Sequence, residues 1–297
     1  MMAENFLRRY VLRCGPSGGE GFEIGNISSA KEEALHISFS IEKSDTESNN
    51  TAKVQIWNLS DESLTVLDGA DCICELKAGY GDTIALILCG TVTSVTTTLD
   101  GADRMTELEV VDGRVELRDT IMSVSLNGTV DPKEVYDKIA SEMGVSIVYA
   151  EDLQFPTLPN GYSFIGKGKN ALQKITKYCG HEWTMQNQIL QITNPGKPLT
   201  TMGYVLSADT GLINIPKKIT LGSKSDRKSD SGSGSSAKAD TGWEVEYLLN
   251  GAIGINDTVI LESKMASGYF RVYKLTIDGD NMEGDWICTA QLIALGA

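Results

Sequence analysis

The sequence predicts a mainly β fold with an α+β insertion, in which two β modules flank a small helix-containing domain. Three observations lead to this prediction. Polar and apolar residues alternate with period two in residues 1–128 and again in residues 199–297, as they do in half-buried strands. Residues 129–198 instead carry the spacing and end signals of amphipathic helices. The chain of 297 residues is long enough for two or three domains with cores of their own.

The first β module, residues 1–128, is expected to contain several strands and a hairpin. Residues 84–98 are rich in β-branched side chains and long enough for one strand with a kink or bulge at Gly90. The turn at residues 99–103 leads into another alternating segment at residues 107–111, as in a β-hairpin. Elsewhere the alternation places these apolar side chains on one side of a strand: Leu35, Ile37, Phe39, Ile41, Val54 and Ile56.

Helix ends can be recognised at three places. The run Ser60-Asp61-Glu62 combines an N-cap with two acidic residues that suit the positive end of a helix dipole. In the insertion, Asp131 is an N-cap, a proline follows at the first helical position, and Gly144 ends the helix. A further helix is expected over about Lys169–Cys179. Strands at residues 145–149, 182–185 and 189–193 complete the expected insertion order of helix, strand, helix, strand, strand.

The second β module, residues 199–297, is expected to consist of strands and one long loop. Residues 222–241 are rich in Ser and Gly and hold no apolar side chain larger than Ala, so burial cannot offset the entropy of ordering them. This segment is therefore expected to be a flexible loop, unless a partner holds it. Strands are expected at residues 203–207, 215–221, 243–249, 258–263, 269–278 and 285–295.

The charge balance restricts the partners that this chain can bind. Its 40 acidic and 26 basic side chains give a net charge of -14, whereas binding to nucleic-acid phosphates depends on clustered Lys and Arg. We therefore expect no conventional nucleic-acid binder, although DNA could pass such a surface without sticking. No run of about 18 apolar residues is present, so we expect no membrane span. The first residues lack a signal-peptide core, and we expect a protein that stays in a cytoplasm or leaves it by a route other than secretion.

The sequence offers little catalytic chemistry. Of its two histidines, His36 is expected to be a solvated strand residue, and His181 to have a structural role at a helix end. No H-E-x-x-H, zinc-ligand or G-x-S-x-G pattern is present, and a cysteine hydrolase built on Cys179 could use only His36 as its base. A carboxylate pair has no spacing rule, so a glycosidase site stays open. We predict no enzyme, and no catalytic, cofactor-binding or metal-binding residues.

Other patterns that look like binding sites are better explained as structure. Residues 166–170 place glycines before a helix but lack the Gly-Lys-Ser/Thr of a phosphate loop. Of the six cysteines, only Cys72 and Cys74 are close in sequence; we expect reduced, packed thiols, with a metal or redox site as the alternative. The acidic residues of the turn at 278–285 are expected to be solvated. The tryptophans are expected in the core or at an interface: Trp57, Trp183, Trp243 and Trp286.

Short patterns in both β modules resemble one known family. Residues 50–60, 76–81 and 86–92 are similar to the N-terminal domain of tailed-phage baseplate hub proteins. The two helices and the weak strand hairpin of the middle segment are similar to the insertion between the barrel halves of these hubs. The C-terminal patterns that resemble the family are residues 243–245, 248–250, 255–257, 259–263, 268–272 and 284–286.

The resemblance implies two tube-like β-barrel or sandwich modules and a structural role. Hub proteins form rings, usually trimers, below the tail tube and above the spike. Three copies with two modules each would match a six-fold tube to a three-fold spike. The expected location is the virion tail baseplate, after assembly in the bacterial cytoplasm. The expected partners are further copies of the chain, the tail tube or tube-initiator protein, the spike protein, the tape-measure protein and other baseplate subunits.

For a ring that passes double-stranded DNA, the acidity of the chain predicts a net acidic channel wall, because such a wall repels phosphates.

Phage tails and other contractile injection systems fit the resemblance equally. Two alternatives stay open. A cell-wall hydrolase of the tail tip would show muralytic activity, and a β-rich module for host glycans would bind cells as a monomer.

Overall fold

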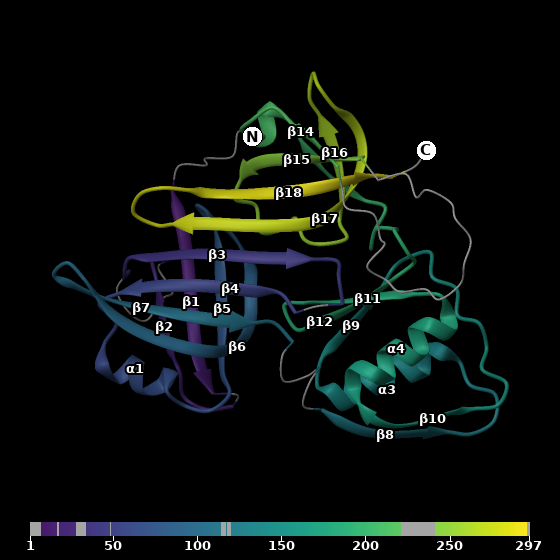
Figure 1. Ribbon diagram of the computed structural model, residues 1–297. Helices are drawn as coiled ribbons and strands as arrows, with labels where there is room; N and C mark the ends of the chain where they lie inside the picture. Colours follow the sequence, from purple (N-terminus) through teal and green to yellow (C-terminus); the bar gives the residue numbers. More distant parts are fainter. Residues whose placement is uncertain are drawn as a thin grey trace.

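The computed structural model describes residues 7–16, 18–27, 34–47, 49–113, 117, 120–220 and 241–295. Figure 1 shows two bodies side by side, a large β body and a smaller body that contains both helices and strands, the α+β body. Each body has its own hydrophobic core. One core draws on strands from the N-terminal and C-terminal parts of the chain, and the other on residues 117–192. The predicted fold class, mainly β with an α+β part, is confirmed.

The β body is built on a sheet of thirteen strands. The hydrogen-bonded order is β14-β15-β18-β17-β3-β4-β7-β6-β5-β1-β2, with β16 and then β13 on a branch from β17. The strands are β1 (Arg8–Pro16), β2 (Phe22–Gly25), β3 (Ile37–Ser44), β4 (Thr51–Trp57), β5 (Cys72–Tyr80), β6 (Thr83–Asp100), β7 (Asp103–Val111), β13 (Gly203–Leu206), β14 (Lys217–Thr220), β15 (Thr241–Leu248), β16 (Thr258–Glu262), β17 (Ser267–Asp280) and β18 (Trp286–Ala294).

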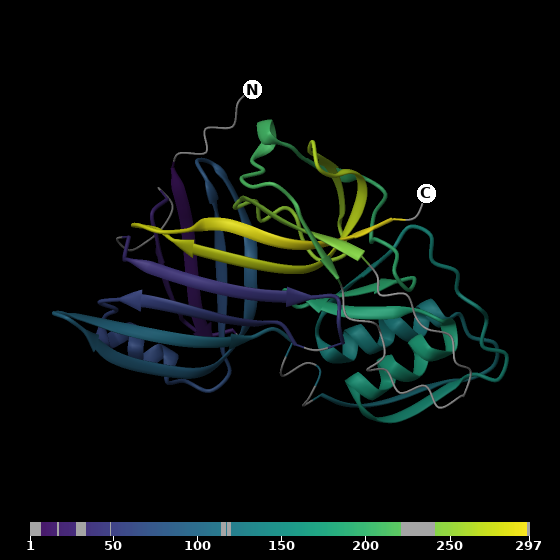
Figure 2. The same ribbon diagram turned by 45° about the horizontal axis from the view of Figure 1, so that its top comes forward.

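Two strands that are far apart in the sequence, β3 and β17, join the N-terminal and C-terminal strands into one sheet (Figure 2). They pair antiparallel, with Ile41 opposite Ile277. On the core side, the ring of Phe39 lies over the backbone of Gly279, where a Cβ atom would come within 2.2 Å of the Phe39 ring. Glycine at 279 is therefore needed for this join. Phe39 also meets Trp286 edge to face, with ring centroids 5.3 Å apart.

Strand β6 bends where it passes from one neighbour to the next. Its first half pairs with β5 and its second half with β7. One register shift lies in the pairing with β5 and another between Val92 and Ser94 in the pairing with β7, so the bulge predicted at Gly90 is displaced by a few residues. Gly90 instead marks a close approach, because a Cβ atom there would lie 2.8 Å from the carbonyl oxygen of Val111.

The predicted helices are confirmed as α1 (Asp61–Leu67), α3 (Pro132–Met143) and α4 (Gly168–Cys179), with a short 3₁₀ turn, η1 (Ala208–Thr210), in addition. The Ser60 hydroxyl accepts a hydrogen bond from the backbone N–H of Ser63 at 3.2 Å, and Asp131 caps α3 in the same manner. Gly144 and Gly180 end α3 and α4 in the left-handed conformation, with φ of 70° and 74°.

The α+β body contains two strands that the sequence analysis did not predict. β8 (Ile121–Leu126) and β10 (Tyr162–Lys167) pair antiparallel beside α3 and α4. The insertion order predicted for residues 129–198 is wrong in omitting β10, and β8 lies before the predicted start of the insertion. Their outward sides carry Ile121 and Ile165, 77% and 79% exposed, which blurs the period-two pattern of a half-buried strand. The remaining strands are β9 (Ser146–Tyr149), β11 (Glu182–Gln186) and β12 (Ile189–Thr193), with β9 parallel to β12.

The C-terminal strands lie within a few residues of their predicted positions. The Ser/Gly-rich segment predicted as a flexible loop, residues 222–241, lies outside the described residues up to position 240. Its last residue, Thr241, is the first residue of β15 and pairs with Thr220 of β14, so the prediction is wrong for that residue.

Candidate functional site

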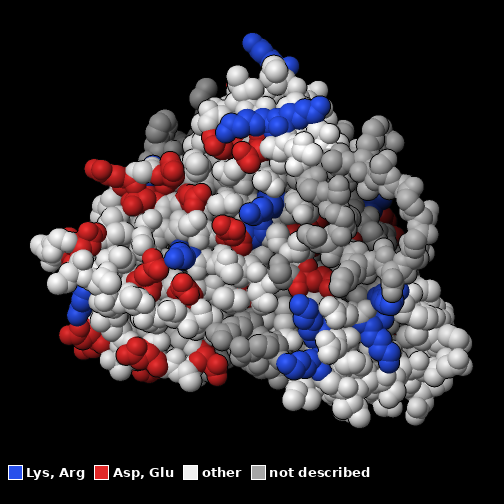
Figure 3. Space-filling model, in the orientation of Figure 1, with Lys and Arg blue, Asp and Glu red and all other residues white. Residues whose placement is uncertain are grey.

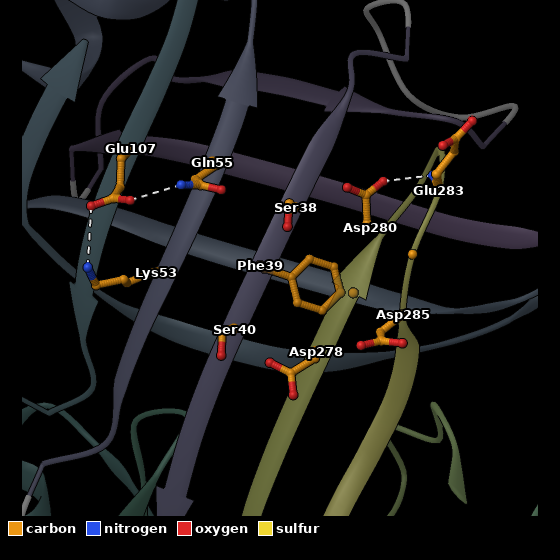
Figure 4. Close-up of a pocket in the computed structure, with 12 residues that line it drawn as sticks. Ser38, Phe39, Ser40, Lys53, Gln55, Glu107, Asp278, Asp280, Glu283 and Asp285 are labelled. Atoms are coloured by element: carbon orange, nitrogen blue, oxygen red, sulfur yellow. Dashed lines mark hydrogen bonds and ion pairs between the residues drawn. The ribbon is translucent and has the colours of Figure 1, made fainter. Parts of the chain in front are cut away.

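One face of the β body carries polar side chains across neighbouring strands. Because side chains alternate along a strand, the neighbours of the core residues in β17, β3, β4 and β7 point away from the core. Figure 4 shows that these side chains surround a shallow hollow over the join of β3 and β17. The hollow is lined by Ser38 and Ser40 of β3, Lys53 and Gln55 of β4, Glu107 of β7 and Asp278 of β17.

The strand registers continue this surface from β7 across the join to β15. We call it the acidic face, because its acidic side chains outnumber its basic ones. Lys53 Nζ lies 3.4 Å from Glu107 Oε1, and Lys274 Nζ lies 3.5 Å from Glu42 Oε2, so these lysines are already paired. The acidic face comprises Glu42, Glu107, Glu109, Glu244, Glu246, Asp278 and Asp280, against Lys53, Lys217 and Lys274.

At one end of the acidic face, His36 is held between an aromatic ring and a carboxylate. Its ring stacks on Trp57 with centroids 3.9 Å apart, and its Nε2 lies 3.0 Å from Asp280 Oδ2. Backbone N–H groups of Met282 and Glu283 donate to Asp280 Oδ1 at 2.9 and 3.0 Å. Partial burial acts to raise the pKa of Asp280, but these hydrogen bonds outweigh it, and the pKa is lowered. The prediction that His36 and Asp280 are merely solvated is therefore wrong.

A buried polar cluster holds the α+β body against the sheet. We call Lys43, Asn50, Asp112, Asn187 and Gln188 the buried joint. Asp112, only 1% exposed, accepts hydrogen bonds from the backbone N–H groups of Asn187 at 2.6 Å and Gln188 at 2.9 Å, at the tip of the β11–β12 hairpin. Asn50 Nδ2 donates to the same carboxylate at 3.3 Å, and Lys43 Nζ donates to Asn187 Oδ1 at 2.7 Å.

The two charged residues of the buried joint depend on each other. Burial lowers the pKa of Lys43 to about 8, and the nearby Asp112 carboxylate opposes this shift. Burial likewise raises the pKa of Asp112, against the hydrogen bonds from Gln188 and Asn187 and the charge of Lys43. A buried charge without its partner is strongly unfavourable. Neither residue could be recognised from the sequence, because a charge at the end of an alternating strand looks exposed to solvent.

A second buried cation, Arg271 of β17, makes a related connection. Its guanidinium Nη1 donates to Asp45 Oδ2 and to Asn256 Oδ1, both at 2.7 Å. Asn256 Nδ2 in turn donates to Gln191 of β12 at 3.2 Å. Arg271 is 3% exposed, so these bonds are made away from water. Together with the buried joint, this connection ties the α+β body to strands from both parts of the sheet.

His181 has the structural surroundings that its place after a helix predicted. Its Nδ1 lies 3.1 Å from the Tyr136 hydroxyl, and its Nε2 lies 3.1 Å from the carbonyl oxygen of Gln154. Because a carbonyl can only accept, Nε2 carries the proton and Tyr136 donates to Nδ1. Burial lowers the pKa of His181, which favours this neutral form. Burial also raises the pKa of the nearby Cys179, the opposite of what an activated thiol nucleophile needs.

The cysteines and the glycine turn also lie in packed surroundings. Cys72 and Cys74 are buried, and the pKa of Cys72 is raised by burial to about 11. Within the described ranges no three His, Cys, Asp or Glu side chains gather as metal ligands would. Gly168 starts α4 against Met143, where a Cβ atom would meet the sulfur at 3.1 Å, so the glycine turn serves packing. None of the helices in the described ranges is long and apolar enough to cross a membrane.

The tryptophans divide between the core and partly exposed positions. Trp183 and Trp286 are buried at 1% and 2% exposure, as predicted for core residues. Trp57 and Trp243 are partly exposed. The Trp57 indole N–H donates to Asp100 Oδ2 at 3.0 Å, so this ring is fixed at the surface by His36 on one side and Asp100 on the other.

Solved structures of other proteins share this fold. No protein-family model matches the chain, and no curated protein matches it. The 43 kDa tail protein of prophage MuSo2 from Shewanella oneidensis matches with a TM-score of 0.59 and 10% identity, over 97% of this chain and 98% of that one. A tail protein from Neisseria meningitidis matches with a TM-score of 0.57 and 11% identity, over 96% of both chains.

A third match extends the comparison to secretion systems. An E. coli component of the type VI secretion system, described as structurally similar to T4 bacteriophage tail proteins, matches with a TM-score of 0.56 and 9% identity, over 91% of this chain and 76% of that one. The chain therefore has the fold of these tail proteins and of this secretion-system component. The family resemblance inferred from the sequence is confirmed at the level of the fold.

Proposed function

We propose that this chain is a structural baseplate hub protein of a phage tail or a related contractile particle. In this proposal three copies form a ring that joins the six-fold tail tube to the three-fold spike. The observation that carries the proposal is the match to a prophage tail protein and to a second tail protein, over almost the full length of each chain. At identities near 10%, these matches support the architecture alone. We argue the hub role from the properties of the sheet.

The sheet supports an arrangement in which three chains present six units of strands. On either side of the β3–β17 join lie four antiparallel strands, β3-β4-β7-β6 and β17-β18-β15-β14. One chain therefore presents two antiparallel units of four strands edge to edge, in a sheet that continues past β6 to β5, β1 and β2. Three such chains would present six units, which suits a protein between a six-fold and a three-fold neighbour.

The acidic face is the surface that we assign to the channel. It includes residues of both four-stranded units, on β3, β4 and β7 of one unit and on β17, β15 and β14 of the other. Its excess of carboxylates repels phosphates, so double-stranded DNA in transit would find no cluster of cations to bind. The Asp280 carboxylate, whose pKa is lowered, stays ionised to a more acidic pH than an ordinary aspartate.

The partners of the ring follow from this position. We assign the tail tube or tube-initiator protein to one side and the spike protein to the other, with the tape-measure protein and other baseplate subunits in contact. The location is the tail baseplate of the particle, after assembly in the bacterial cytoplasm. We assign no enzyme activity. No arrangement among the described side chains favours the cell-wall hydrolase or the glycan-binding module over the hub.

Native mass spectrometry and electron microscopy of the purified chain test the proposal, with and without the spike and tube proteins of the same particle. The expected result is a closed ring of three copies that binds both partners. A chain that stays monomeric with both partners present contradicts the hub. Muralytic activity that one carboxylate substitution abolishes would favour the hydrolase, and cell binding by a monomer would favour the glycan-binding module.

A further inference from the structure

A hairpin tip at one end of the β body combines an exposed apolar side chain with fixed carboxylates. β6 and β7 extend past the neighbouring strands to a tight turn (Figure 1). Leu99 is 82% exposed there, and Asp100 and Asp103 flank the turn. We call these three residues the acidic tip. Asp100 accepts from the Trp57 indole at 3.0 Å and Asp103 from the Asn58 amide at 2.9 Å, so both carboxylates are held in position.

A hollow of complementary character lies in the α+β body, between β10 and α4. It has a volume of about 440 Å³, with more apolar than polar lining. We call it the basic hollow. Its apolar lining is formed by Leu158, Tyr162, Ile175 and Tyr178, and two exposed lysines, Lys174 and Lys177, stand at its rim.

The charge of this region is unusual for the chain. Residues 162–180 contain four lysines and no acidic residue, in a chain with a net charge of -14. Lys174 Nζ donates to the carbonyl oxygen of Ser163 at 2.7 Å and lies 4.9 Å from the centre of the Tyr162 ring. Neither Lys174 nor Lys177 forms an ion pair with any carboxylate of the described residues. The hollow therefore presents unpaired positive charge around an apolar floor.

The acidic tip and the basic hollow lie at opposite ends of the molecule. In Figure 1 the β6–β7 hairpin projects at the far left, whereas α4 and β10 lie at the lower right. Figure 3 shows the matching charges, with mostly red side chains at the left and a group of blue side chains at the lower right. One copy cannot bring its own tip to its own hollow, but two copies can meet head to tail.

We propose that the acidic tip of one copy docks in the basic hollow of the next, with Leu99 in the apolar floor and Asp100 and Asp103 facing Lys174 and Lys177. This inference rests on the proposed hub function, because it specifies how copies of the chain meet in the ring. A head-to-tail contact uses two different patches on each copy, so it closes into a ring when the rotation between copies fits. It also brings opposite charges together in copies that otherwise repel each other.

An engineered disulfide tests the geometry. Leu99→Cys and Ser163→Cys, combined in one chain, place one thiol on the tip and one on the wall of the hollow. Under mild oxidation with copper phenanthroline, the double variant is expected to give covalent oligomers up to the size of the ring on non-reducing gels. The matched control combines Leu99→Cys with Ser267→Cys, another exposed serine, and is expected to give no ladder beyond dimers.

Charge reversal tests the electrostatics. Lys174→Glu with Lys177→Glu is expected to weaken self-association of the chain at least about tenfold, and Asp100→Lys with Asp103→Lys to do the same. All four substitutions together should restore association, because the charges again match. The control, Lys218→Glu with Lys264→Glu, changes the net charge equally at exposed positions elsewhere and should leave association unchanged. Sedimentation velocity measures association, and thermal melting shows whether each variant is folded.

The outcomes separate this contact from the proposed function. If both reversal variants still form the ring that the wild type forms, and the cysteine pair gives no covalent ladder, the proposed contact is wrong. The hub function is then unaffected. A chain that stays monomeric in wild-type form, even with spike and tube proteins, overturns both. Restored association in the fourfold variant supports the contact even if one reversal pair alone lowers the melting temperature, because a misfolded chain would not regain association.

Discussion

The carboxylate of Asp112, just after β7, accepts a 2.6 Å hydrogen bond from the backbone N–H of Asn187 at the tip of the β11–β12 hairpin. The two residues are 75 positions apart in the chain. Through this bond the hairpin of the α+β body is anchored on the sheet of the β body. The relative orientation of the two bodies therefore depends on a buried anion.

Asp112→Asn is expected to destabilise the protein by about 3 to 5 kcal/mol, the usual cost of breaking a buried charge pair. The amide removes the negative charge near Lys43. Its NH₂ group would also face the backbone N–H groups of Asn187 and Gln188, which need an acceptor. Urea denaturation at neutral pH measures the change. Asp61→Asn is the control, because Asp61 pairs with Arg104 at the surface and should cost no more than about 1 kcal/mol. Equal losses in the two variants would contradict the role of the joint.

Lys43→Met is expected to change how stability depends on pH. The pKa of Lys43 is lowered from 10.5 to about 8 in the folded protein. Between these values Lys43 binds more protons in the unfolded chain than in the folded one, so its own contribution to the free energy of unfolding rises with pH through this window. The variant lacks this contribution. The free energy of unfolding of the wild type minus that of the variant should therefore increase by about 3 kcal/mol across this pH window.

Denaturation of both proteins at pH 8 and about pH 10.5 measures this difference. The variant is needed as a reference because other groups also titrate at high pH. Buried tyrosines and cysteines of raised pKa, such as Tyr10 and Cys72, lower the free energy of unfolding as pH rises. They are present in both proteins, so their effect cancels in the difference. A constant difference between wild type and variant across this window would show that Lys43 does not titrate abnormally.

Gly279→Ala is expected to disturb the join between β3 and β17. The added methyl group would overlap the ring of Phe39 and displace it, at a cost of about 1 to 3 kcal/mol. Gly254→Ala is the control, because its nearest neighbour would be a carboxylate oxygen at 3.5 Å. Adding Phe39→Leu to Gly279→Ala should recover part of the loss in thermal denaturation. A harmless Gly279→Ala would show that the ring can move aside freely.

The acidic face can be tested by giving it positive charge. Glu109→Lys with Asp278→Lys is expected to raise affinity for short double-stranded DNA at least about tenfold at low salt, with a salt dependence steeper by about two counterions. Fluorescence anisotropy at several salt concentrations measures both quantities. The control combines Glu62→Lys on α1 with Asp68→Lys at the C-cap of that helix, and makes the same change of charge off this face. Equal DNA binding by both variants would argue against a channel role for the acidic face.

Much of the local structure could be predicted from the sequence, because its causes are local. The caps Ser60 and Asp131 and the stop at Gly144 act within one helical turn. Alternation in β3 and β17 depends only on the two-residue period of a strand. β8 and β10 escaped prediction because Ile121 and Ile165 are exposed where an alternating strand would carry polar residues.

The candidate site was harder to predict, because it is made by contacts between distant residues. His36 looked solvated in its strand, yet it is held by Trp57 and by Asp280 from the other end of the chain. No prediction covered Lys43 and Asp112, because only the arrival of the β11–β12 hairpin brings their partners Asn187 and Gln188 to them.

The sequence by itself determined most of the helices and strands, the acidity and the resemblance to tail proteins, since these depend on residue type and short-range spacing. The tertiary structure alone decided that β3 pairs with β17 and that acidic residues of both modules lie on the same face of the sheet. Strand pairing across more than 200 residues is selected by packing, such as Phe39 over Gly279, and no local pattern encodes it.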